Sequence, residues 1–78
     1  MAKLYLLDDD IHTFDEVVSV LRKYLSFPMT QGQSVANIVN NNGKCDIYTG
    51  DIIMVEDLYE LFRKEGFSVE IDETYEME

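Results

Sequence analysis

Residues 3–25 read KLYLLDDDIHTFDEVVSVLRKYL, and this stretch predicts a strand, an acidic turn and a helix in succession. The apolar run 3–7 is long enough for a short strand buried on both faces, which favours a central place in a sheet. Three consecutive aspartates, residues 8–10, end the run. Thr13 and Glu16 then have the spacing of a capping box. The apolar residues after them recur at steps of three and four, which is the stripe of an amphipathic helix.

Similar signals divide the next part of the chain. Thr30 and Gln33 have the spacing of a second capping box and predict the start of another helix. The asparagines and the glycine at 40–43 end that helix, because these residue types tolerate left-handed backbone. Residues 44–49 (KCDIYT) alternate in polarity and include β-branched and aromatic side chains. They therefore predict a strand.

A third helical stripe follows and ends at Gly66. Its start is left open, because residues 52–54 fit either the end of the strand or the first turn of the helix. Residues 67–71 alternate between apolar and polar side chains and predict a half-exposed strand. The predicted order is thus β-α-α-β-α-β, in one domain over residues 1–72 with an acidic flexible tail at 73–78. This is an α+β fold, with a three-stranded antiparallel sheet and three helices packed on one face.

The composition narrows the classes of partner. The chain has 78 residues, of which 16 are acidic and 6 basic, and its formal net charge is −10. Such acidity argues against nucleic acid, which proteins bind by neutralising phosphates, and against an anionic membrane surface. The hydrophobic content of 46% is too high for a disordered chain. A small folded domain that meets cationic groups is the class that remains.

The single cysteine and the start of the chain bear on its location. Cys45 excludes an internal disulfide and a multi-cysteine zinc site, and it fits a buried thiol in a reducing compartment. The apolar run at 3–7 is too short for a signal peptide or a membrane span. We therefore expect a cytoplasmic protein that is monomeric.

The densest group of chemically active side chains is the acidic turn together with His12. Three adjacent carboxylates repel one another unless a cation or turn amides stabilise them. The residues alone leave four interpretations: hydrogen bonds within the turn, a hard-metal site, a general acid–base pair, or a receptor for a positively charged group.

The spacing weakens two of these interpretations. Adjacent strand residues point to opposite faces, so consecutive aspartates converge poorly on one ion, and no calcium-loop pattern is present. His12 has no serine or cysteine partner at a recognisable spacing, and there is no glycine-rich phosphate loop. We expect no enzymatic activity, no metal and no cofactor. A small metal-dependent enzyme built on these acids is the alternative from a different class.

The chain also resembles a known family. Residues 6–25 are similar to the opening of ClpS, the adaptor of bacterial Clp proteases, where a strand, an Asn-Asp-Asp turn and a Thr-Pro-Met step precede a helix. The resemblance continues through residues 26–43 (SFPMTQGQSVANIVNNNG), which end where ClpS has Val-His-x-x-Gly. Residues 44–49 then resemble its Cys-Gly-Val-Tyr/Phe-Thr strand after a short deletion, and Arg63 and Val69 match positions near the end of the ClpS domain. The fold implied is also similar to the C-terminal domain of the ribosomal stalk protein.

The resemblance implies a function in regulated proteolysis. ClpS binds the exposed N-terminal residue of a substrate, which is typically a bulky Leu, Phe, Tyr or Trp, and hands it to an AAA+ unfoldase. An α-ammonium group needs acceptors and negative charge, and the side chain beside it needs an apolar pocket. Carried over by position, the residues implied to bind the amine are Asp8, Asp9, Asp10, His12 and Asn40. Those implied to form the apolar pocket are Phe14, Val17, Ala36 and Val39.

The chain also departs from the ClpS pattern. Asp8 replaces an asparagine, Asn40 replaces a histidine, and Phe14 replaces a gatekeeping methionine. The N-terminal extension that delivers substrates is expected to be absent, and of the stretch that docks on the N-domain of the unfoldase only Asp51 has a counterpart. The predicted function is a non-enzymatic N-terminus-binding adaptor of a Clp protease. The alternative is an interaction module of the same fold that has lost delivery and acts as a competitor or binds a basic partner.

Overall fold

The computed structural model describes residues 1–73, in the predicted element order. The elements are β1 (Ala2–Leu7), α1 (Phe14–Leu25), α2 (Met29–Asn42), β2 (Lys44–Gly50), α3 (Ile52–Lys64) and β3 (Val69–Glu73). The α+β class and the β-α-α-β-α-β order are confirmed. Glu73, the first residue of the expected tail, closes β3, and residues 74–78 lie outside the described residues.

The sheet is built around the N-terminal strand. Its order is β2-β1-β3, and both pairings are antiparallel. Leu4 lies opposite Tyr48 of β2 and Ile71 of β3. The central place predicted for residues 3–7 is therefore correct. The burial is not equal on the two sides, however: Ala2, Leu4 and Leu6 are buried, and the residues between them are half-buried. One face of the sheet is thus covered more fully than the other.

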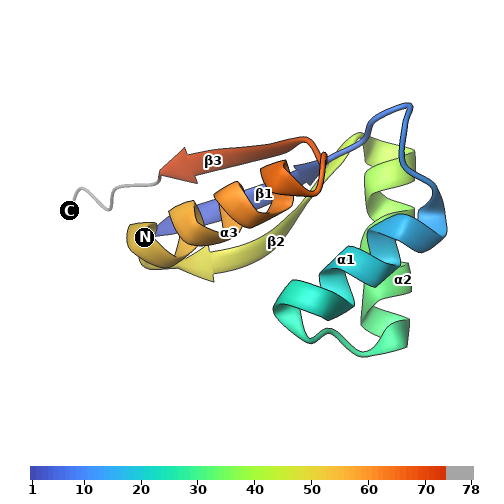
Figure 1. Ribbon diagram of the computed structural model, residues 1–78, viewed down its shortest axis with the longest axis horizontal. Helices are drawn as coiled ribbons and strands as arrows, with labels where there is room; N and C mark the ends of the chain where they lie inside the picture. The colour runs from blue at the N-terminus through green and yellow to red at the C-terminus, as the bar shows by residue number, and fades with distance from the viewer. Residues whose placement is uncertain (74–78) are drawn as a thin grey trace.

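The helices gather over the buried face and beyond one end of the sheet. Figure 1 shows α3 running along the sheet, with α1 and α2 paired beyond the end where β1 finishes and β2 begins. Phe62 of α3 and Leu4 and Leu6 of β1 are fully buried. They form one hydrophobic cluster with the inward residues of α1 and α2, which include Leu21 and Val39. The α1–α2 pair is therefore attached to the sheet through a continuous core.

The first predicted capping box is present. The hydroxyl of Thr13 accepts a hydrogen bond from the backbone N–H of Glu16 at 3.2 Å, and the Glu16 carboxylate accepts one from the backbone N–H of Thr13 at 2.8 Å. The second predicted box, at Thr30 and Gln33, is wrong. The helix begins earlier, after Pro28, and no side chain caps it. Because a capping residue needs extended backbone, Thr30 cannot cap a helix that already contains it.

Two further boundaries are decided by backbone geometry. Residues 52–54 form the first turn of α3 after Asp51, whose backbone is extended. At the other end, Gly66 has φ 89°, and the N–H of Phe67 donates to the carbonyl of Phe62 at 3.0 Å. Phe67 is therefore part of the helix termination, and the last strand starts at Val69, two residues later than the alternation predicts.

Replacing Thr13 by alanine removes the cap of α1. We expect Thr13→Ala to lower the free energy of unfolding by about 1 kcal/mol, measured by urea denaturation. Thr30→Ala is the matched control, because Thr30 is exposed and caps nothing. Equal losses in the two variants would contradict the capping assignment.

Candidate functional site

A small pocket lies where the turn after β1 meets α1 and the end of α2. Its volume is about 110 Å³, and it is lined by Asp8, His12, Thr13, Phe14, Val17, Ala36, Val39 and Asn40. Seven of the nine site residues expected from the sequence line this pocket. Asp9 and Asp10 do not line it. The structure thus brings together residues that are far apart in the chain.

Backbone hydrogen bonds hold the turn against the end of α2. The N–H of Asp8 donates to the carbonyl of Gly43 at 2.8 Å, and the N–H of Leu7 donates to the carbonyl of Ser68 at 2.9 Å. Gly43 has φ 93°, a conformation that glycine adopts at little cost, and its N–H donates to the Val39 carbonyl at 2.9 Å. Asp8 is therefore held close to the last turn of α2, which contributes Val39 and Asn40 to the pocket.

The carboxylate of Asp9 organises the turn from within. Its Oδ1 accepts hydrogen bonds from the backbone N–H groups of Ile11 at 2.9 Å and His12 at 2.8 Å, and its Oδ2 lies 2.9 Å from His12 Nδ1. An ionised carboxylate can only accept, so Nδ1 carries the proton in this pair. The two side chains are only 14% and 13% exposed. The predicted interpretation as hydrogen bonds within the turn thus describes Asp9.

His12 links this turn to the connection between α3 and β3. Its ring stacks on Phe67 with the ring centroids 3.8 Å apart and an interplanar angle of 17°. Phe67 is itself buried, and its ring meets Phe62 edge-on. The position of His12 is therefore set by the hydrophobic core as well as by Asp9. This arrangement leaves the ring as one wall of the pocket.

The hydrogen bonds to Asp9 determine its ionisation. Burial raises the pKa of Asp9, but hydrogen bonds from the backbone N–H and ring of His12 and from the N–H of Ile11 outweigh burial. The pKa therefore lies below its ordinary value of 3.8. A carboxyl group of this kind stabilises the folded state at pH values above 3.8, and that stabilisation is lost as the pH falls through the lower folded-state pKa.

The pocket has a polar rim and an apolar floor. Asp8 and Asn40 are exposed, and their carboxylate and amide oxygens are hydrogen-bond acceptors. Ala36 and Val39 are buried below them. Phe14 is 40% exposed and stands at the rim. Acceptors beside an apolar hollow suit a ligand that combines a cationic donor with an apolar side chain.

Two features of the site were missed by the sequence reasoning. Thr13 lines the pocket as well as capping α1, although it was assigned only the capping role. Asp9 was grouped with its neighbours, although the spacing from Asp9 to the N–H groups two and three residues later is the signal of an aspartate-stabilised turn. Asp8 and Asp10 have the same spacing to later N–H groups, so the sequence does not reveal which aspartate accepts these hydrogen bonds; the structure assigns them to Asp9.

Three further observations within residues 1–73 concern metal ions, membranes and the single thiol. Within that range no group of three or more His, Cys, Asp or Glu side chains is arranged to hold a metal ion. No helix of the described part is long and apolar enough to cross a membrane. Burial, and to a smaller degree the charge of Asp46, raises the pKa of the Cys45 thiol. Such a thiol is a poor nucleophile at neutral pH.

Comparison with known protein families gives a match for the part of the chain that forms this pocket. The model of the family described as "ATP-dependent Clp protease adaptor protein ClpS" matches residues 1–68. No individual curated protein gives a significant match. The matched region contains every residue that lines the pocket.

The role of Asp9 can be tested by its pH dependence. We expect Asp9→Asn to lower the free energy of unfolding by about 1–3 kcal/mol near neutral pH, because hydrogen bonds to a charged acceptor are lost. The difference from the unaltered protein should shrink as the pH falls below 3.8, where that protein loses the same charge. Urea denaturation across this range measures both quantities. Asp10→Asn is the control, and a pH-independent loss for Asp9→Asn would refute the assignment.

Proposed function

The chain belongs to the ClpS family of ATP-dependent Clp protease adaptors, and we propose that it binds the free N-terminal amine and the apolar first side chain of substrate polypeptides. The observation that supports this most strongly is the pocket, in which exposed acceptors stand beside a buried apolar floor. In this proposal the protein catalyses nothing. It selects polypeptides by their first residue for a Clp-type AAA+ unfoldase.

The amine is assigned to Asp8 and Asn40. An α-ammonium group carries three donors and a positive charge, so it gains most from an ionised acceptor with a second acceptor nearby. Asp8 supplies the charge, and the amide oxygen of Asn40 supplies the second acceptor. Both residues line the pocket. Asp9 acts indirectly in this proposal, because its hydrogen bonds fix the turn that carries Asp8.

The size of the pocket limits the first side chain. A volume of about 110 Å³ is small beside the roughly 300–1,000 Å³ of typical ligand pockets. A pocket of this size favours a compact aliphatic side chain such as leucine over the larger rings of phenylalanine, tyrosine or tryptophan. Phe14 stands at the rim where a smaller or more flexible residue would leave more room. We therefore propose that this chain prefers leucine.

The dependence on a free amine is the most direct test. We expect a Leu-initiated peptide to bind at least about tenfold more tightly than its N-acetylated form, because acetylation removes the charge that Asp8 meets. Fluorescence anisotropy with a labelled peptide measures both affinities. Asp8→Asn should reduce this preference, whereas Asp10→Asn removes the same charge outside the pocket and should leave it unchanged. Equal affinity for the free and acetylated peptides would rule out the proposal.

The preference for leucine has its own test. Phe14→Met should increase the affinity for a Trp-initiated peptide relative to a Leu-initiated one, by about tenfold if the tryptophan ring becomes buried. Competition between the two peptides for the same site measures the ratio. An unchanged ratio would show that Phe14 does not limit the pocket. Adding the protein to a Clp degradation reaction then distinguishes delivery, which accelerates loss of the Leu-initiated substrate, from competition, which slows it.

A further inference from the structure

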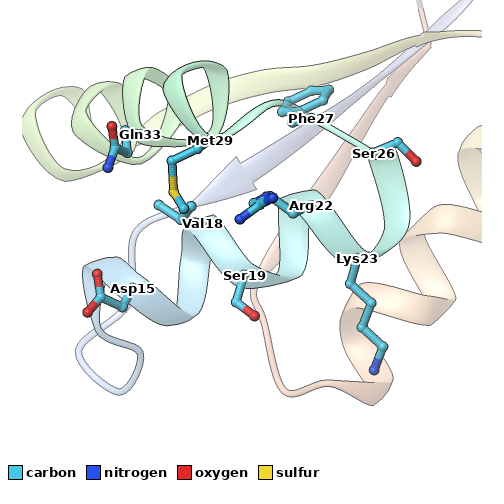
Figure 2. A pocket seen from close by; sticks show the side chains of 9 residues that line it. All are labelled: Asp15, Val18, Ser19, Arg22, Lys23, Ser26, Phe27, Met29 and Gln33. Atoms are coloured by element: carbon cyan, nitrogen blue, oxygen red, sulfur yellow. The ribbon is translucent and has the colours of Figure 1, made fainter.

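A second and larger hollow lies on the α1–α2 pair. It has a volume of about 640 Å³ and is formed by one side of α1 from Asp15 to Lys23, the connection at 26–28 and the first turns of α2. Figure 2 shows the two helices bordering it, with side chains from both around the opening. It shares no lining residue with the pocket at Phe14. Its volume lies within the range of ligand sites, which is about 300–1,000 Å³.

The floor of this groove is apolar. Val18, Phe27 and Met29 line it, and Met29 is 47% exposed. Gly32 allows the helices to approach here: a Cβ atom at Gly32 would lie 3.1 Å from Val18 Cγ1. A larger residue would push α2 away from α1 and change the floor. The close approach of the helices therefore brings Val18 of α1 and Met29 of α2 into the lining of one groove.

Arg22 carries a positive charge into the groove. Within residues 1–73 its side chain makes no hydrogen bond and no ion pair, and in Figure 2 it extends towards Val18 and Met29. The neighbouring Lys23 is already engaged, because its Nζ donates to a Glu65 carboxylate oxygen at 2.9 Å. An arginine above an apolar floor is suited to a carboxylate, which its planar fork binds with two parallel hydrogen bonds.

We propose that this groove docks a short peptide segment in which a carboxylate adjoins a large apolar side chain. The carboxylate binds Arg22, and the apolar side chain lies on Phe27 and Met29. Asp15 lines the opposite end of the groove and disfavours a carboxylate there, so the segment binds in one direction. The net charge of −10 repels an acidic protein as a whole. The partner is therefore a segment with an isolated acid.

Blocked peptides test this without engaging the pocket at Phe14. The probes are acetyl-Ser-Leu-Glu-Phe-Ser-amide and the same peptide with Gln in place of Glu, titrated into isotope-labelled protein and followed by NMR chemical shifts. We expect the Glu peptide to bind about tenfold more tightly, with the largest shifts at Val18, Phe27 and Met29. Arg22→Gln should abolish that difference. Arg63→Gln, which removes the same charge on α3, should preserve it.

Each other outcome overturns the proposal. Equal affinity for the Glu and Gln peptides, or no binding at several millimolar, would show that Arg22 recruits no carboxylate. Shifts confined to the residues around Phe14 would place the peptide in the first pocket. Shifts in the groove on concentrating the protein alone would assign the groove to a second copy of the chain. None of these outcomes bears on the preference for a free amine, which is tested separately.

Discussion

The carboxylate of Asp9 is the constraint on which the pocket depends. It satisfies two backbone N–H groups and one imidazole N–H of the turn between β1 and α1. The two His12 groups lie in a partly buried part of the turn, where the Asp9 carboxylate takes the place of water as their partner. With these hydrogen bonds made, the turn connects the end of β1, followed by Asp8, to the start of α1 at Thr13 and Phe14. The geometry of the pocket thus follows from the satisfaction of polar groups in one turn.

The three aspartates of the acidic turn have different roles in the structure. Asp9 faces inward and is part of the fold. Asp8 lies at the rim of the pocket, where an ionised oxygen is open to a ligand. Asp10 is exposed and outside the pocket. The single figure of −10 for the net charge hides these differences, because a count of charges contains no information about direction. The net charge also does not reveal Arg22, a positively charged side chain that lines the groove of an otherwise acidic protein.

Sequence patterns correctly predicted those features of the fold that depend on residues close together in the chain. The capping box at Thr13, the apolar stripe of α1 and the central strand were correct, because each is decided within one or two turns of chain or by hydrophobicity alone. The capping box predicted at Thr30 was wrong, because α2 begins directly after Pro28. A spacing pattern does not reveal at which residue the helix starts. The gathering of Asn40 with Asp8 came from a family resemblance. No sequence pattern predicts the larger groove, because its shape depends on how α1 and α2 pack against each other.

The central place of β1 also has a consequence for how the chain acquires its structure. Ala2 pairs with Gly50 on one side and with Glu73 on the other. Both partners of β1 come later in the chain, so its buried side chains stay uncovered until β2 and β3 have been made. Pairings between distant parts of a chain are slow to form. Completion of the sheet therefore depends on β3, and until then the apolar side chains of β1 are open to contacts with other chains.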